Sequence, residues 1–253
     1  MHELTLVVLI ENSAPAGLLR EHGLSFYLEY RGHACLLDAG SSGAFLRNAA
    51  DLGIDLSLVE RAALSHGHYD HADGLAAFFA ANRTAAVFAR PHITDTDFFG
   101  PEYIGVNPGL LHRHQKRFDL AEGPRQLFPG LHLIPDSVIH EQSLVAETRQ
   151  GLVVLNSCCH AGAGYIIQDL KTRFPGQPVR ALLGGLHLMG RDGPKSLGTT
   201  PGIVKNLGRW LLDELEVGEL YTGHCTGLPA FDLLAEAHPH RVRPLTTGLT
   251  LTF

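Results

Sequence analysis

The stretch that decides the fold is Ser65-His66-Gly67-His68-Tyr69-Asp70-His71, which follows an apolar segment and precedes a segment with helical periodicity. Residues two apart in an extended chain point the same way, so His66 and His68 can chelate one metal ion. The turn into the helix directs Asp70 and His71 towards a neighbouring position. One histidine among 16 is usually structural or exposed, but three histidines and an aspartate within six residues predict a site for Zn, Fe or Mn.

Outward from this motif, the hydrophobic pattern predicts strands and helices in alternation. Strands are expected at about 4–10, 24–30 and 33–38, in the segment that runs into Ser65, and at about 85–89, 131–135, 143–149, 152–156, 179–184, 218–222 and 244–253. Helices are expected at about 43–52, 72–82, 163–173, 201–214 and 228–237. Residues 91–130 have weak periodicity, and we interpret them as an inserted loop region in a single domain that spans 1–253. Runs of antiparallel strands with helices between them fit two packed sheets covered by helices.

The composition is that of an ordinary globular protein, with 45% hydrophobic residues, 18% charged residues and a formal net charge of -6. This balance gives no electrostatic reason to expect nucleic acid, so the expected partner is a small-molecule substrate. The apolar run at 4–10 lies between Glu3 and Glu11 without a basic start or a cleavage site, which indicates a first strand and not a signal peptide. No stretch has the roughly 18 apolar residues of a membrane helix. We therefore expect a cytoplasmic protein without a membrane partner, of an oligomeric state that the sequence does not specify.

Several motifs resemble those of one known family. Ser65 to Gly74 resembles the HxHxDH signature of the metallo-β-lactamase superfamily, and Leu36-Leu37-Asp38-Ala39-Gly40 resembles the strand-aspartate-glycine motif that precedes it. Further segments are similar to the subfamily named for dihydropterin-ribofuranosylaminobenzene-phosphate synthase: Glu141-Gln142-Ser143-Leu144, Ser157-Cys158-Cys159-His160-Ala161-Gly162, Gly184-Gly185-Leu186-His187-Leu188 and Thr222-Gly223-His224-Cys225-Thr226-Gly227. Members of that subfamily are often described only as metal-dependent hydrolases. The resemblance implies an α/β fold, a four-layer αββα sandwich of two mixed sheets covered by helices, with two metal ions at one edge of the sheets.

The same resemblance implies the metal ligands. The first ion would be bound by His66, His68 and His160, and the second by Asp70, His71 and His224, with Zn expected and Fe or Mn as alternatives. His160 and His224 each follow an apolar strand, where a rigid element can present a ligand. The alternative for both is a buried histidine satisfied by hydrogen bonds. Asp38 is expected to orient a ligand or the loop that carries it, with a turn aspartate as the alternative.

One departure from the family concerns the strand expected at 179–184. Many superfamily members place an aspartate that bridges the two metals after this strand, whereas this chain has Gly184-Gly185-Leu186-His187. His187 is therefore a candidate metal ligand, proton carrier or substrate contact, or else a structural residue.

The four cysteines are too few and too irregularly spaced for a disulfide framework. Cys158, Cys159 and Cys225 are more often packing residues than ligands.

Two loops are candidates for binding a substrate. Thr200 can cap a helix that begins at Pro201, and helix N-termini attract anions. The candidate contacts for a phosphate or carboxylate are Lys195, Ser196, Thr199 and Thr200, with a solvated capping loop as the alternative. Lys195 and Arg191 would supply the local positive charge that attracts the anion. The basic cluster at 112–117 is the second candidate, although a solvated basic loop is the main interpretation there.

The sequence thus predicts a metal-dependent hydrolase that acts on a small anionic ester or phosphate-bearing metabolite through a metal-activated water. Asp70 would orient that water or accept its proton, and His187 would protonate the leaving group. One alternative is the transferase that the subfamily's name implies, which would condense a pterin diphosphate with a ribofuranosylaminobenzene phosphate. An alternative of another class is a non-catalytic or redox metal-binding protein with the same fold.

Overall fold

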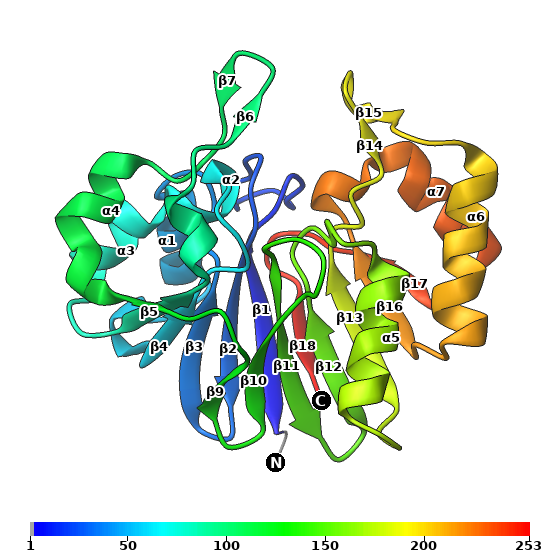
Figure 1. The fold of residues 1–253 in the computed structure, drawn as a ribbon, viewed down its shortest axis with the longest axis horizontal. Coiled ribbons are helices and arrows are strands. Elements are labelled where there is room, and N and C mark those ends of the chain that lie inside the picture. Colours follow the sequence, from blue (N-terminus) through cyan, green and yellow to red (C-terminus); the bar gives the residue numbers. More distant parts are fainter. Residues whose placement is uncertain (1–2) are drawn as a thin grey trace.

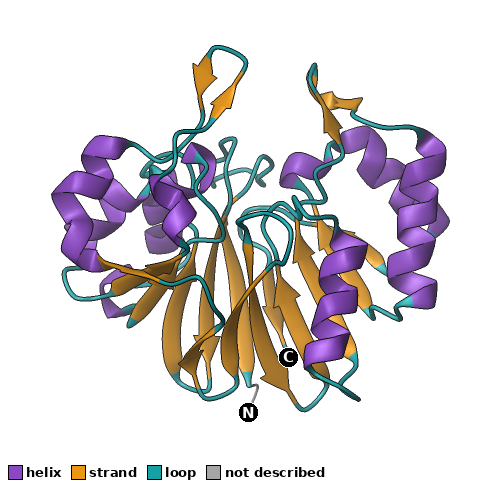
Figure 2. Cartoon of the chain, viewed as in Figure 1, coloured by secondary structure: helices purple, strands orange, loops and turns teal. Residues whose placement is uncertain are grey.

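Two seven-stranded sheets lie face to face at the centre of the computed structural model, which describes residues 3–253 (Figures 1 and 2). The first sheet contains, in spatial order, β18 (Thr250–Thr252), β1 (Leu4–Ile10), β2 (Ser25–Tyr30), β3 (His33–Leu37), β4 (Arg61–Ala63), β5 (Ala86–Ala89) and β8 (Phe118–Leu120). The second contains β17 (Val242–Pro244), β16 (Glu219–Thr222), β13 (Val179–Gly184), β12 (Gly151–Leu155), β11 (Gln142–Thr148), β10 (Leu131–Pro135) and β9 (Arg125–Phe128). Both sheets are mixed. In the first, β1, β2 and β3 pair antiparallel and β3, β4 and β5 pair parallel. In the second, β9, β10, β11 and β12 pair antiparallel and β12, β13 and β16 pair parallel.

Helices cover the outer face of each sheet (Figure 1). The first sheet is covered by α1 (Ala44–Asp51), α3 (Leu75–Ala81) and α4 (Pro108–His114), and the second by α5 (Ala163–Arg173), α6 (Pro201–Arg209) and α7 (Leu228–Ala237). The shorter helical segments are η1 (Leu56–Leu58), α2 (Tyr69–Ala72), η2 (Pro91–Thr94), η3 (Gln115–Arg117), η4 (Trp210–Glu214) and η5 (His224–Thr226). None of the helices between residues 3 and 253 combines the length and apolarity that crossing a lipid bilayer requires.

Three apolar layers hold the four structural layers together. Adjacent residues of a strand face opposite sides of its sheet, and β1 uses both sides. Leu6 belongs to the core between the two sheets, whereas Val7 packs in the core under the helices of the first sheet with Phe45 and Phe78. A third core lies between the second sheet and its helices, around Ile167. The predicted αββα sandwich is confirmed.

The functional residues gather at one edge of the sandwich because the parallel strands end there. The loops that follow β3 and β4 in the first sheet carry Asp38 and the motif at 65–71, and the loops that follow β12, β13 and β16 in the second carry His160, His187 and His224. Two hairpins rise above this edge (Figure 1): β6 (Phe98–Phe99) with β7 (Glu102–Tyr103), and β14 (Met189–Gly190) with β15 (Gly193–Leu197).

Several predicted elements differ from the structure. The helix expected at 72–82 begins later, as α3 at Leu75, because Ala72 ends the separate short helix α2. Gly74 lies between the two helices, where a Cβ would lie 1.9 Å from the Ala39 carbonyl oxygen. The helix expected at 201–214 changes to π-helical geometry at Trp210. Residues 91–130 contain one seven-residue helix and strands of two to four residues, of which β8 and β9 belong to the two large sheets. Elements this short cannot show periodicity in the sequence.

Candidate metal centre

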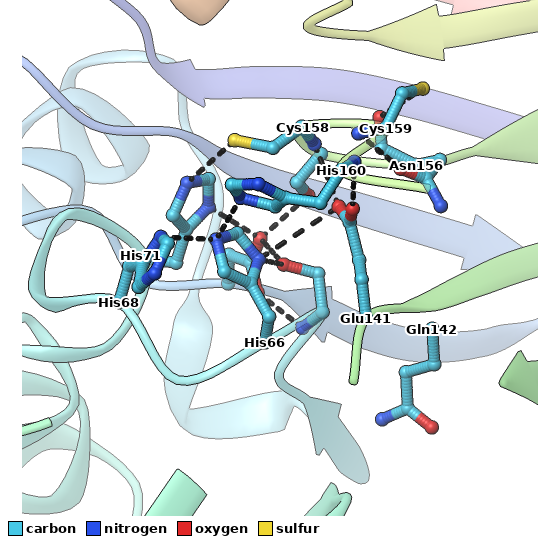
Figure 3. Close-up of polar contacts among 12 residues, drawn as sticks. His66, His68, His71, Glu141, Gln142, Asn156, Cys158, Cys159 and His160 are labelled. Carbon is cyan, nitrogen blue, oxygen red and sulfur yellow. Dashed lines mark hydrogen bonds and ion pairs between the residues drawn. The ribbon is translucent and has the colours of Figure 1, made fainter. Parts of the chain in front are cut away.

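Three imidazole nitrogens converge at the position predicted for the first metal ion (Figure 3). His66 Nε2 lies 3.0 Å from His68 Nδ1 and 3.3 Å from His160 Nε2. Two nitrogens bound to a tetrahedral zinc ion at about 2.0–2.1 Å are about 3.3 Å apart. The three nitrogens are therefore already spaced as ligands of one ion.

In two of these rings, those of His66 and His68, the other nitrogen contacts a protein oxygen. Asp97 Oδ2 lies 2.9 Å from His68 Nε2, and Ser65 Oγ lies 2.9 Å from His66 Nδ1. A carboxylate can only accept a hydrogen bond, so Asp97 selects the tautomer of His68 that carries its hydrogen on Nε2 and leaves Nδ1 free for a metal. The sequence analysis did not identify Asp97, because nothing in the chain before the β6–β7 hairpin marks it as a partner of the motif.

A buried glutamate fixes the loop that carries His160. Glu141 has no exposed surface, and its two carboxylate oxygens accept hydrogen bonds from the backbone N–H groups of Cys158 at 2.7 Å and His160 at 2.8 Å. Burial raises the pKa of Glu141 to about 7, against the opposing effect of these two donors. Glu141 lies in a motif quoted above, but its partners became visible only in the folded chain.

The second position is centred on Asp70. Its Oδ2 lies 3.3 Å from His224 Nε2, 3.3 Å from His22 Nε2 and 3.6 Å from His71 Nε2. Burial favours a raised pKa for Asp70, but His71, His224 and His22 together outweigh it and hold the pKa well below its usual range, so the group is a carboxylate. The structure thus brings the predicted Asp70, His71 and His224 together and adds His22, which the sequence analysis did not identify.

Two of these histidines, His71 and His224, are also oriented by contacts of their second ring nitrogen. His71 Nδ1 lies 2.8 Å from Asp38 Oδ2, and His224 Nδ1 lies 3.2 Å from Asn12 Oδ1. His224 Nε2 is buried and makes no hydrogen bond, although it faces the Asp70 carboxylate. A buried polar atom without a partner costs about 1–3 kcal/mol, which a bound cation would remove. The residues at both positions therefore fit metal ions.

Asp38 connects the two positions. Its carboxylate accepts hydrogen bonds from Ser65 N and Ser65 Oγ, both at 2.7 Å, and from Ser157 Oγ at 2.6 Å, in addition to its contact with His71. Asp38 is fully buried, so these donors replace the water that a carboxylate would otherwise require. It ties the motif at 65–71 to the loop after β12, which lies in the other sheet.

The backbone of the site is strained at four residues that are not glycine. Asp38, Cys159, His187 and His224 have φ values of 59°, 53°, 53° and 49°. Residues other than glycine rarely adopt this left-handed backbone conformation. They occur mostly at functional sites, where the surrounding fold enforces the conformation.

A cavity of about 300 Å³ opens beside these residues. His68, Asp70, His160 and His224 form part of its wall, together with His187, whose ring centroid lies 4.3 Å from that of His160. A hydrogen bond with Cys225 raises the pKa of His187, against the effect of burial. The structure thus places His187 at the cavity and outside the groups of three mutually close donor atoms found among residues 3–253.

The predicted anion contacts lie elsewhere. None of Lys195, Ser196, Thr199 and Thr200 lines this cavity; Ser196 Oγ donates to the Gly193 carbonyl, and Thr200 Oγ1 accepts from Ile203 N as the cap of α6. Arg191 of the same hairpin does line it, and its guanidinium lies 5.7 Å from the ring centroid of Phe99 on the opposite hairpin. Arg191 supplies the only Lys or Arg side chain in the cavity wall that the structure describes.

Comparisons with known proteins identify the family and the fold. A Methanocaldococcus jannaschii protein named 7,8-dihydropterin-6-methyl-4-(beta-D-ribofuranosyl)-aminobenzene-5'-phosphate synthase is 25% identical over 274 positions, covering 92% of this chain and 90% of that protein. The crystal structure of a metal-dependent hydrolase of the beta-lactamase superfamily is 26% identical and superposes with a TM-score of 0.82 over 98% of both chains. A diphosphatase from the PhnP family, at 16% identity and a TM-score of 0.60 over 99% of this chain and 98% of that one, shares the fold. The sequence model described as the metallo-beta-lactamase superfamily matches residues 19–173, and this chain therefore belongs to that superfamily.

Proposed function

We propose that the protein is a metal-dependent hydrolase that holds two transition-metal ions, one at His66, His68 and His160 and one at Asp70, His71 and His224. The observation that carries this proposal is the spacing of 3.0 and 3.3 Å between three imidazole nitrogens, since two of these rings also have their other nitrogen in contact with a protein oxygen. Divalent ions bound there would supply Lewis acidity, which lowers the pKa of water and polarises a substrate oxygen. The donor set of imidazoles and one carboxylate suits Zn, with Fe or Mn as alternatives.

The protein's own residues then have separate roles. Asp70 is the carboxylate at the second position and would orient the attacking water or take its proton. His187 stands at the wall of the cavity beside His160 and would deliver a proton to the leaving group. Asp38, Glu141 and Asp97 would hold the surrounding side chains and loops in place through their hydrogen bonds.

The substrate that we propose is a small anionic metabolite, such as a phosphate-bearing ester. Arg191 faces the cavity and can pair with a phosphate or carboxylate, while Phe99, Tyr69 and Met189 offer apolar surface beside it. The residues predicted from the sequence, Lys195, Ser196, Thr199 and Thr200, stay a prediction for a contact outside this cavity. With a formal net charge of -6, the protein needs a local cation to attract an anion.

A second activity, the condensation performed by a synthase, is favoured by one observation. The relative that is 25% identical over 92% of this chain carries that name. In that reaction the same metal positions would face a departing diphosphate instead of an attacking water.

Metal analysis followed by product analysis tests the proposal. Protein prepared without chelators should contain Zn, Fe or Mn, and it should cleave at least one of a chromogenic phosphodiester, a phosphomonoester and a carboxyl ester. A chelator should remove the activity and the metal should restore it. Hydrolysis in ¹⁸O-labelled water should place the label in the product. A loaded protein that cleaves none of these, yet joins a diphosphate donor to an acceptor without taking up label, would be a synthase.

A further inference from the structure

The two metal positions share one buried donor that the proposed ligand set does not use. Cys158 Sγ lies within 4.8 Å of the ligand atoms of His66 and His71, and also within 4.8 Å of those of His224 and Cys225. Among residues 3–253, Cys158 is the donor common to these two groups. We propose that Cys158 binds metal as a thiolate between the two positions; this inference rests on the proposed metal centre.

The sulfur has the spacing of a ligand relative to His71. Cys158 Sγ lies 3.4 Å from His71 Nε2, the ring nitrogen left free because Nδ1 contacts Asp38 (Figure 3). A sulfur at about 2.3 Å and a nitrogen at about 2.0–2.1 Å from one tetrahedral zinc ion are about 3.6 Å apart. The second group contains His224, whose buried Nε2 has no hydrogen-bond partner. The His71 and His224 donor nitrogens thus both lie near the Cys158 thiol.

The packing of the four cysteines separates Cys158 and Cys225 from ordinary core residues. Cys35 belongs to the apolar core between the sheets, and Cys159 belongs to the core under α5. Cys158 is buried with 3% of its surface exposed, but it belongs to neither core nor to the third one. Figure 3 shows its sulfur directed at the histidines, whereas the side chain of Cys159 points away from them.

The end of β13 supplies no side chain that could compete for this place. A Cβ on Gly184 would lie 1.8 Å from the Asn156 carbonyl oxygen, and a Cβ on Gly185 would lie 2.3 Å from Cys225 Sγ. Both residues therefore must be glycine for the loops after β12, β13 and β16 to meet. The carboxylate that many family members place here is excluded by this packing, and the Cys225 thiol lies against Gly185 instead.

Binding would exchange one proton for one metal bond. The Cys158 S–H bond breaks as the metal–sulfur bond forms, and the proton passes to solvent. Glu141 holds the backbone N–H of Cys158 at 2.7 Å, so the thiol does not have to move a loop to reach the site. A thiolate favours Zn and Fe over Mn, which prefers oxygen ligands.

Cobalt substitution tests the inference without a substrate. Metal-free wild-type protein is titrated with Co²⁺ up to two equivalents and followed in the near ultraviolet, where thiolate-to-cobalt charge transfer absorbs. We expect this band in the wild type and in Cys159→Ser, the matched control, and its loss in Cys158→Ser. Cys225→Ser should retain it.

The other possible results of the cobalt titration decide between the role of Cys158 and the metal centre as a whole. Two bound cobalt ions without the band in the wild type, or a band that survives Cys158→Ser, would overturn the role of Cys158 and leave the proposed metal centre standing. A wild type that binds no metal would overturn both. If Cys158→Ser does not fold, X-ray absorption of zinc-loaded Cys225→Ser decides: a sulfur neighbour at about 2.3 Å supports the thiolate, and a shell of nitrogen and oxygen alone refutes it.

Discussion

His22 Nε2 lies 3.3 Å from Asp70 Oδ2, and the two side chains meet because their backbones are joined. Leu24 N donates to the Asp70 carbonyl oxygen at 3.2 Å, and a Cβ on Gly23 would lie 2.7 Å from that same oxygen. The His22 ring also stacks on that of His224, with centroids 5.0 Å apart. The loop before β2 is thus fixed to the second metal position through its backbone, and it presents an imidazole there.

We expect His22→Ala to weaken binding of the second metal ion by about 10- to 100-fold, whether His22 contacts the ion or only Asp70. Affinity for the first ion should not change. Competition titrations with a chromophoric chelator measure both constants. His33→Ala is the control, because His33 pairs with Glu60 at the surface. Equal second-site affinity in wild type and His22→Ala would show that the contact with Asp70 has no role in binding.

Asp70→Asn should abolish turnover while the fold and the first metal ion persist. The substitution keeps the side-chain volume but removes the carboxylate that the second ion and the attacking water require. Steady-state kinetics, metal content and circular dichroism together test this. Turnover near the wild-type value at equal metal content would contradict the role assigned to Asp70.

Glu141→Gln should lower both stability and first-site affinity. Glutamine has one carbonyl oxygen for the two N–H donors of Cys158 and His160, so one buried donor loses its partner at a cost of about 1–3 kcal/mol. Urea unfolding of the metal-free protein gives the free energy, and a zinc titration gives the affinity. Glu147→Gln, at a half-buried position on β11, should change zinc affinity little. Identical unfolding curves for Glu141→Gln and wild type would exclude this role.

The metal-free protein should lose stability as pH falls below 6.5, in part through His160. Burial, and then the neighbouring histidines, lower the pKa of His160 from 6.5 to about 2. Between these values the unfolded chain binds a proton that the native chain does not, so acid favours unfolding by up to about 1.4 kcal/mol per pH unit for such a group. The raised pKa of Glu141 acts in the opposite direction between 4.5 and about 7. Comparison with His160→Gln isolates the histidine: the variant's unfolding free energy should vary less steeply between pH 6.5 and 5, and an unchanged slope would contradict the assignment.

Arg191→Ala should raise KM for an anionic substrate about tenfold and leave KM for a neutral analogue unchanged, because the only Lys or Arg side chain described in the cavity wall is lost. Lys195→Ala, on the same hairpin but outside the cavity, should have a smaller effect. A larger effect of Lys195→Ala would indicate that the anion binds at Lys195, as predicted from the sequence, and not at Arg191.

The sequence predicted those parts of the site that depend on local geometry. His66, His68, Asp70 and His71 follow one strand within a single short segment, so their spacing alone fixes their directions. His160 and His224 follow parallel strands, and parallel strands end at one edge. The sandwich itself followed from the alternation of strands and helices together with the family resemblance.

The residues that the sequence did not reveal reach the site through tertiary contacts. His22 depends on a hydrogen bond between Leu24 and the Asp70 carbonyl, which no spacing encodes. Asp97 lies beside a hairpin whose strands have two residues each, too short to give a pattern. The sequence indicates both Arg191 and Lys195 as sources of positive charge on one hairpin, but it does not reveal that only Arg191 lines the cavity.

The two hairpins carry a consequence for how this enzyme family diversifies. The donors for both metal positions lie on the sandwich or on loops fixed to it, whereas Phe99 and Arg191 belong to hairpins that form two small sheets of their own. The tip of a hairpin can therefore be lengthened or exchanged without disturbing the strands that hold the donors, as long as the base of the β6–β7 hairpin keeps Asp97 beside His68. If Arg191 contacts the substrate as we propose, substrate preference can evolve at these two tips while the donors at the sheet edge are inherited unchanged.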